Sequence, residues 1–524
     1  MRRFNVTGLC VPEEDYMVDI SGKVEQISKL IDSRSYFTIN RARQYGKTTT
    51  LACLENALKN RYLVASISFE GLSEKKFESP EAFCPMFLKK IAKSLEFTPA
   101  PKQYVQEWIN NEITDFDLLS EHITEMCRDN KVVLMVDEVD KTSNNQVFLH
   151  FLGMLRDKFL LRKNRKDYTF HSVILAGVYD IKNIKLKMIN EGKHPRAAEE
   201  NKIYNSPWNI AVNFIVDMSF SPHEIAAMLG EYEADHNTGM DIMAISDEIY
   251  RFTSGYPFLV SRICQAIDEE LDQDWTIGGV QKAVQKILKE QNTLFEDLFK
   301  NIKNNKKLAN YLYDLLFIGI EKNFNINNSL VNLGYMYGFF KEADGKVRVA
   351  NKIFETLIYN YFVSENGDNE EIPKITGVLQ QDVVRNGRFD MELCLLKFAE
   401  YYVEIFGGCD LKFIEKQGRL LFLLYLQPLI NGQGFYHIES QFTDQRRMDI
   451  VVDFGRDQFI IELKIWYGNS RHQEAYEQLL GYMENKKALN GYLLTFDFRK
   501  EANKQRRAEW VDFDGGKRIF DVVL

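Results

Sequence analysis

The chain has 524 residues, of which 45% are hydrophobic and 27% are charged, so its whole length can be folded, in three or four domains at roughly 150 residues each. Lys and Arg number 66 against 75 Asp and Glu, a net charge of −9, which excludes a protein that coats nucleic acid through bulk positive charge. No stretch approaches the roughly 20 apolar residues of a membrane span, no apolar segment follows Met1-Arg2-Arg3 as in a signal peptide, and the seven cysteines form no CxxC pair. We therefore expect a cytoplasmic protein without a membrane partner.

The first part of the chain alternates apolar runs with helical patterns. The runs are continuous rather than alternating, which is typical of parallel strands covered on both faces. We therefore expect an α/β domain over residues 1–217. The five runs expected to form strands are residues 35–40, 62–69, 131–136, 171–178 and 210–216.

From Ser221 onward the pattern is helical, and Ser221-Pro222-His223-Glu224 is typical of a capped helix start. Helical stretches are expected at 241–252, 257–271 and 280–300. Asp344-Gly345 between short β-prone runs predicts a hairpin, and helices followed by a hairpin suggest a winged helix. The expected segments after the first domain are a helical lid at 218–300, the winged helix at 301–363, a polar linker at 364–380 and a second α/β domain at 381–524.

Residues 40–49 lie between the first expected strand and a helical pattern, which is the context of a phosphate-binding loop. In such a loop Lys47 reaches the β- and γ-phosphates of a nucleotide and Thr48 holds Mg2+. The general pattern GxxxxGK followed by Ser or Thr has a glycine where this chain has Arg41, and Gly-Lys-Thr alone also fits an ordinary helix start. The residues expected to bind the nucleotide are Arg43, Gly46, Lys47, Thr48, Thr49 and Asp137.

The third apolar run ends in Asp137-Glu138, about 90 residues after the loop. A carboxylate at the end of such a strand organises the Mg2+ shell of a phosphate-loop ATPase, and Glu138 can orient or deprotonate the attacking water. A solvated strand end is the alternative, but loop and strand end in this order make nucleotide binding the better hypothesis.

These blocks resemble a known family. YFTINRARQYGKTTTL, VVLMVDEVDK, SVILAGVYDI and SGYPFLV are similar to segments of the bacterial AAA-ATPase-like proteins, phosphate-loop proteins related to the STAND ATPases. The resemblance covers about residues 1–365 and implies that arginine at the first glycine position is a family trait, although Ala42 replaces the family's proline. It also implies family matches at Asp140 and Lys141. It further implies a sensor strand ending at Tyr179-Asp180, for which a core strand is the alternative. Finally, it implies a lid turn at Gly255-Tyr256-Pro257, for which an ordinary helix-breaking turn is the alternative.

A second constellation lies near the C-terminus. Met448–Phe454 and Phe459–Lys464 are expected to form a hairpin in which Glu462 and Lys464, two residues apart, share a face opposite Asp449. Two carboxylates can bind Mg2+ or Mn2+, and an ammonium can position water and offset phosphate charge. A charged surface hairpin is the alternative, but charges inside so apolar a strand are costly unless a site needs them.

With the helix that carries Gln478 and Tyr482, this hairpin resembles the PD-(D/E)XK nuclease superfamily. The resemblance implies that Asp449, Glu462 and Lys464 are catalytic and that Gln478 and Tyr482 support them. It also implies an upstream glutamate in the metal shell, for which Glu415 is our first candidate and Glu439 the rival.

The sequence therefore predicts an α/β multidomain protein: an ATP-binding, ATP-hydrolysing domain with a lid and winged helix, followed by a restriction-endonuclease-like domain. We expect ATP and Mg2+ as cofactors, nucleic acid as substrate, and a nucleotide state that gates cleavage. A homo-oligomer and a protein trigger stay open as partners. The alternative is a STAND-like regulatory switch whose nuclease-like fold does not cut.

Overall fold

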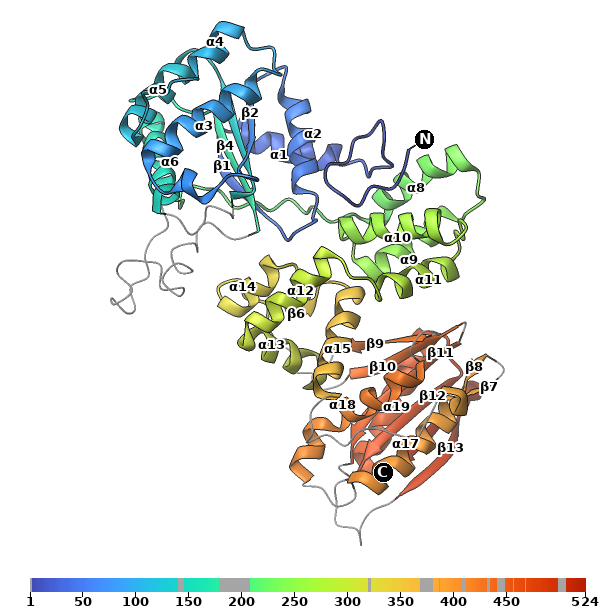
Figure 1. The fold of residues 1–524 in the computed structure, drawn as a ribbon. Helices are drawn as coiled ribbons and strands as arrows, with labels where there is room; N and C mark the ends of the chain where they lie inside the picture. Colours follow the sequence, from blue (N-terminus) through green and yellow to red (C-terminus); the bar gives the residue numbers. More distant parts are fainter. Residues whose placement is uncertain are drawn as a thin grey trace. The chain divides into compact units, whose positions relative to one another are not determined.

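The computed structural model describes residues 2–139, 146–178, 208–318, 322–367, 380–385, 387–406, 411–430, 434–440, 448–455, 457–466, 468–497 and 506–524 (Figure 1). The chain divides into two compact units. The first is Met1–Trp275 with Tyr335–Gly338, and the second is Thr276–Gly334 with Phe339–Leu524. The five-segment boundaries expected from the sequence stay predictions.

The first unit contains a parallel sheet in the order β1-β4-β3-β2. One face packs on a large core that includes Leu134 and Leu175, and the alternate residues Val133 and Ile174 are also fully buried on the other face. The parallel sheet covered on both faces is thus confirmed. Its strands are β1 (Tyr36–Asn40), β2 (Leu63–Ser68), β3 (Val132–Asp137) and β4 (Ser172–Gly177). Its helices are α1 (Ser21–Asp32), α2 (Lys47–Leu58), α3 (Pro80–Leu95), α4 (Lys102–Glu107), α5 (Phe116–Arg128) and α6 (Gln146–Lys163).

The fifth expected strand, residues 210–216, is wrong. This segment makes one bridge to the sheet, in which the Val212 N–H donates to Tyr36 O at 2.9 Å. Residues 213–216 make no further bridge to the sheet, and Ile215 is 87% exposed. An apolar run without further backbone pairing does not extend the sheet.

The helices α8 (Pro222–His236), α9 (Ile242–Thr253) and α10 (Pro257–Glu270) occupy the segment expected to form a lid, a role that stays a prediction. The start of α8 lies where a capped helix start was expected, and α9 and α10 lie within one residue of the expected stretches. Ser221 and Glu224 form a reciprocal capping box at the start of α8. The single helix expected at 280–300 is wrong, since it is two helices, α11 (Ile277–Ile287) and α12 (Thr293–Asn304). The break occurs because Asn292 caps α12 by accepting from the Phe295 N–H.

The second unit begins with helices and a hairpin. Asp344 and Gly345 both have positive φ angles, 50° and 71°, as a tight two-residue hairpin turn requires, so the expected hairpin is confirmed. Residues 364–367, expected to begin a linker, belong to the last helix of this part, and residues 368–379 lie outside the described residues. The elements after α12 are α13 (Lys306–Tyr313), the π-helical η4 (Asp314–Ile318), α14 (Ser329–Met336), β5 (Phe340–Ala343), β6 (Lys346–Val349) and α15 (Lys352–Gly367). Their identity as a winged helix stays a prediction.

The C-terminal part is a six-stranded mixed sheet in the order β13-β14-β12-β11-β10-β9. The helix α19 packs on one face through Leu479, Tyr482 and Met483, and α17 packs on the other, where Tyr402 meets Phe496 at 5.5 Å. The strands are β9 (Gly434–Ser440), β10 (Met448–Phe454), β11 (Asp457–Ile465), β12 (Asn490–Phe496), β13 (Arg507–Phe513) and β14 (Lys517–Val523). The remaining elements are α16 (Gln380–Val383), β7 (Val384–Arg385), β8 (Arg388–Phe389), α17 (Met391–Phe406), α18 (Leu411–Ile430) and α19 (Asn469–Asn485).

A buried polar network fixes α19 on its sheet. The Asp521 carboxylate on β14 is fully buried, and its Oδ2 lies 2.9 Å from His472 Nε2 and accepts from the Tyr476 hydroxyl at 2.6 Å and from Arg507 Nε at 2.8 Å. Burial alone would raise the pKa of Asp521, but the hydrogen bonds of His472 and Tyr476 and the charge of Arg507 hold it below its usual value. The orientation of α19 is therefore set by charge-assisted bonds as well as by packing.

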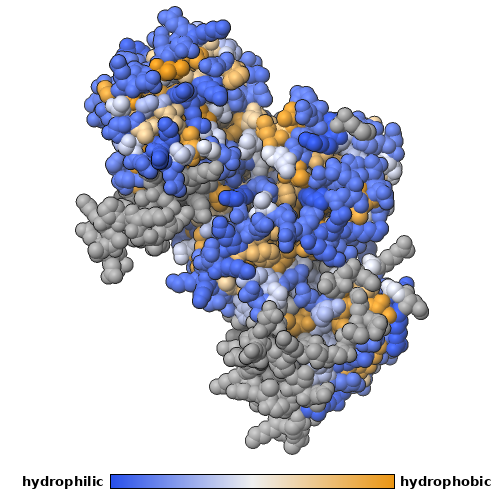
Figure 2. Space-filling view, viewed as in Figure 1, coloured by the Kyte–Doolittle hydropathy of each residue, from blue (hydrophilic) through white to orange (hydrophobic). Residues whose placement is uncertain are grey.

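Among the described helices, none combines the length and apolarity that a bilayer span requires. On the face shown in Figure 2, hydrophilic residues predominate and hydrophobic residues are scattered among them.

The stability of the first unit is expected to depend on pH through His171. Burial, with the nearby charges of Arg34 and Arg162, lowers the pKa of His171 from 6.5 to about 4. The folded state thus keeps this ring neutral while the unfolded state protonates it, so stability is lost as the pH falls from 6.5 toward 4. In urea unfolding, His171→Gln should lose less stability than wild type between about pH 7 and about pH 5, by roughly 2 kcal/mol. The same change at the exposed His223 is the control, and equal pH dependence in all three proteins would contradict the assignment.

Candidate nucleotide and metal sites

The loop between β1 and α2 adopts a compact turn without a glycine at position 41. Left-handed backbone occurs at Gln44 (φ 56°) and Gly46 (φ 76°), and Arg41 is not among the residues with positive φ. An arginine is therefore tolerated without strain. Its guanidinium donates to Val216 O at 2.8 Å and lies 5.3 Å from the Phe214 ring. The side chain therefore links the loop to residues 214–216.

The Lys47 ammonium lies within this loop. Its Nζ donates to the carbonyls of Arg41 at 3.0 Å and Ala42 at 2.9 Å, and the residue is only 6% exposed. Gly46 caps α2, and the amide end of a helix attracts an anion. The ammonium and the helix end thus place positive charge at the same loop.

The sheet order brings Asp137 on β3 to the loop. The Thr48 hydroxyl donates to Asp137 Oδ2 at 2.7 Å, and Asp137 Oδ1 accepts from the Glu138 N–H at 2.9 Å. Asp137 is 7% exposed, and Glu138 follows it with a left-handed backbone, φ 56°. A hydroxyl and a carboxylate in contact supply the oxygen donors that Mg2+ prefers, so this pair fits the expected metal.

Two of the residues expected to bind the nucleotide, Arg43 and Thr49, contact other parts of the chain. The Arg43 side chain is exposed, and its carbonyl accepts from the Tyr256 hydroxyl at 2.5 Å. The Thr49 hydroxyl accepts from the Cys10 N–H at 3.4 Å and borders a cavity.

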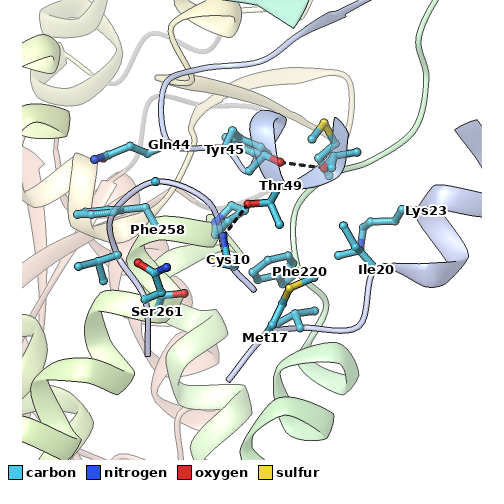
Figure 3. A pocket seen from close by; sticks show the side chains of 18 of the residues that line it. Cys10, Met17, Ile20, Lys23, Gln44, Tyr45, Thr49, Phe220, Phe258 and Ser261 are labelled. Atoms are coloured by element: carbon cyan, nitrogen blue, oxygen red, sulfur yellow. Dashed lines mark hydrogen bonds between the residues drawn. The ribbon is translucent and has the colours of Figure 1, made fainter. Parts of the chain in front are cut away.

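The cavity beside the loop has a volume of about 340 Å3 (Figure 3). One wall comes from the N-terminal segment at residues 5–20 and another from the lid, where Phe220, Phe258 and Ser261 line it. Its lining is mainly apolar, and its floor is the start of α2 at Gly46 and Thr49. An apolar chamber next to a phosphate loop suits a flat heterocyclic ring. Sequence reasoning missed the N-terminal segment, which carries no motif.

The lid turn Gly255-Tyr256-Pro257 contacts the loop directly. The Tyr256 ring packs edge-on against Tyr45 at 4.7 Å, and burial raises the pKa of Tyr45. Gly255 has φ 73°, and a Cβ there would come 2.0 Å from Phe220 O, so the turn requires glycine. The turn thus starts α10 and contacts the loop, and its role in a lid stays a prediction. The expected matches at Asp140, Lys141, Tyr179 and Asp180 lie outside the described residues.

A row of acidic positions crosses three strands of the C-terminal sheet. Asp449 on β10 stands directly opposite Glu462 on β11 and Glu439 on β9. Partners in register share a face of the sheet. The structure therefore brings the backbone positions of the predicted carboxylates together. Glu415 lies in the first half of α18, and no register relates it to this row.

The charged pair on β11 is not a solvated surface. Glu462 is 2% exposed and forms an ion pair with Lys464, whose side chain is 18% exposed. The surface-hairpin alternative is therefore wrong for Glu462. Tyr482 on α19 is 6% exposed in the core over the same face, and Gln478 Oε1 is buried without a partner among the described residues. Within the described side chains, no group of three or more His, Cys, Asp or Glu could hold a metal ion.

Comparison with known proteins gives one family. A family model described as an AAA-like domain matches residues 16–362, whereas no curated protein matches the chain. A Walker-type ATPase of Pyrococcus abyssi is 11% identical with a TM-score of 0.46, covering 68% of this chain and 99% of that one. The RuvB Holliday junction branch migration motor of Thermotoga maritima is 11% identical with a TM-score of 0.33, covering 68% of this chain and 98% of its own.

Proposed function

Because the chain belongs to the AAA-like domain family over residues 16–362, we propose that this region binds ATP with Mg2+ and hydrolyses it. The observation that carries the proposal is the Thr48 to Asp137 hydrogen bond at 2.7 Å, beside the Lys47 ammonium in the loop. It unites the two halves of a phosphate-loop site, which lie in separate segments of the sequence.

Each residue then has a role. Lys47 and the amide end of α2 neutralise the β- and γ-phosphates, and Thr48 and Asp137 hold the metal. Mg2+ would supply charge neutralisation of the phosphate oxygens. Glu138, next to Asp137 at the end of β3, orients or deprotonates the attacking water. The apolar cavity between the N-terminal segment and the lid receives the base.

A filled cavity tests this assignment. Ser261→Trp should weaken ATP binding by on the order of 10-fold or more in titration calorimetry, because the indole occupies the space the base needs. Ser73→Trp, at an exposed position, is the matched control. If wild type does not bind ATP, or if Ser261→Trp binds it as tightly as wild type does, the proposal that this cavity receives the base of ATP is wrong.

We further propose that the C-terminal sheet is a metal-dependent nuclease. The support is the register of Asp449 with Glu462, together with the buried Glu462 to Lys464 contact under α19. Carboxylates at Asp449 and Glu462 fit Mg2+ or Mn2+, which would polarise the scissile phosphate. Lys464 would position the attacking water and offset charge on the phosphate.

The ATP state is proposed to gate this cleavage. The Tyr256 hydroxyl bond to Arg43 O joins α10 of the lid to the phosphate loop, so a change in the loop reaches the lid. The regulatory alternative has one observation in its favour, since the Glu462 to Lys464 contact also suits a structural ion pair. Cleavage by wild type and its loss in Lys464→Ala separate the two.

A further inference from the structure

The corner between α12 and α13 carries a concentrated positive charge. Residues 298–313 contain four lysines and no acidic residue, a local charge of +4 in a chain whose net charge is −9. We name this surface the lysine elbow. Its lysines, all exposed, are Lys300, Lys303, Lys306 and Lys307.

The local fold explains why the four charges lie together. Lys300 and Lys303 are one turn apart near the end of α12, and Asn305 starts α13 by accepting from the Leu308 N–H. The chain therefore turns within one residue, and Lys306 and Lys307 follow at once on α13. Lys303, in the last turn of α12, is favoured by the dipole of that helix.

The ion pair that the elbow forms among the described residues is weak. Lys303 lies 3.9 Å from Glu365, but both side chains are more than half exposed, so the pair is weak. Among the described residues, no ion pair is recorded for the other three lysines. Two aromatic rings border the surface, since Lys303 lies 5.6 Å from the Tyr361 ring and Phe299 packs on that ring at 5.4 Å. Basic groups beside aromatic rings suit nucleic acid.

One helix ties the elbow to the predicted cleavage sheet within the second unit. Glu365 and Tyr361, the partners of Lys303, belong to α15. On the same helix Tyr359 packs against Tyr436 of β9 at 5.8 Å, and Asn360 accepts from Gln427 of α18 at 3.1 Å. The strand β9 is the direct neighbour of β10, which carries Asp449. The elbow is thus anchored to the edge of the sheet that holds the acidic row.

From this arrangement we propose that the lysine elbow binds the phosphate backbone of the nucleic-acid substrate and holds it on the unit that cleaves it. The inference rests on the proposed nuclease function, and it deepens that function by naming where the substrate docks. It also explains how a chain with a net charge of −9 could bind nucleic acid, because phosphate contacts need only a local basic surface.

The test measures binding apart from cleavage. Labelled duplex DNA and single-stranded RNA are titrated with the full chain in the presence of EDTA, over a range of salt concentrations. Replacing all four elbow lysines by glutamine should weaken binding on the order of 10- to 100-fold at low salt and flatten the plot of log affinity against log salt by about 3 to 4. Lys300→Gln with Lys307→Gln should give about half of that change in slope.

The matched control replaces four exposed lysines of the first unit, Lys75, Lys76, Lys89 and Lys93, by glutamine. This removes the same charge elsewhere and should leave the slope near that of wild type. Circular dichroism establishes that each variant is folded, and the two-lysine variant replaces the four-lysine variant if the latter unfolds. Elbow variants that bind like the control overturn the proposal.

Two further outcomes are decisive. If the elbow variants lose binding to vesicles of equal parts phosphatidylcholine and phosphatidylserine but keep nucleic-acid binding, the surface contacts membranes and the proposal is wrong. If wild type binds through the elbow but cleaves nothing, the nuclease function fails while the docking surface stands. Cleavage with unchanged KM in the elbow variants rejects the docking surface and keeps the nuclease.

Discussion

Lys464→Ala is expected to abolish metal-dependent cleavage of nucleic acid, with a rate loss on the order of 1000-fold or more. Lys464 lies two residues from Glu462 on the same face of β11, and its ammonium contacts the Glu462 carboxylate. In the proposed reaction, the variant would neither offset the charge that develops on the phosphate nor position the water. Gel-based or fluorescence-based cleavage with Mg2+ or Mn2+ measures the loss.

Two companion variants make the result interpretable. Glu462→Gln should lose cleavage equally, because a neutral amide is a poor ligand for a hard cation. Arg518→Ala removes an exposed cation that pairs with Asp512 on the same sheet and should cleave as wild type does. If Lys464→Ala still cleaves, the catalytic assignment is wrong. If wild type does not cleave and Lys464→Ala only loses stability, the structural ion pair of a regulatory module is the better account.

Lys47→Ala is expected to weaken ATP binding on the order of 100-fold and to abolish hydrolysis. Lys47 is 6% exposed and its ammonium lies inside the loop, so its removal takes a positive charge away from the place where the phosphates would bind. Calorimetry and phosphate release measure the two effects. Lys59→Ala, at the exposed end of α2, is the control, and ATP binding in Lys47→Ala equal to that of the control contradicts the loop assignment.

The strands and the loop were predictable because their signals are local. Continuous apolar runs gave four of the five expected strands, and the order of loop and Asp137 placed Thr48 and Asp137 in one site, where they are 2.7 Å apart. The fifth run was mistaken because residues 210–216 make one bridge to the sheet rather than a ladder, and Val216 is the one buried residue among them. Composition does not distinguish these cases.

The cavity could not be predicted, because its walls come from three separate segments. Residues 5–20, the loop and the lid meet only in the folded chain, and none of the N-terminal residues carries a periodic or motif signal. The role of Arg41 is similar. Its backbone conformation and its bond to Val216 O explain why glycine is dispensable, and neither is visible in the sequence.

The acidic row was predictable in part. Alternation along the second strand predicted that Glu462 and Lys464 share one face, and the short turn predicted that Asp449 lies opposite them. In the structure Asp449 is the direct partner of Glu462. The third carboxylate was not decided by spacing, since Glu415 and Glu439 lie on different elements. The register puts Glu439 directly beside Asp449, which is information that only strand pairing supplies.

The central claim is that one chain couples a nucleotide site to phosphodiester cleavage. The most direct measurement is the initial rate of Mg2+-dependent cleavage without nucleotide, with ATP and with ADP, in wild type and in Lys47→Ala. We predict that the wild-type rate changes between the three conditions and that the Lys47→Ala rate is the same in all of them. A wild-type rate that is identical in the three conditions would contradict the coupling.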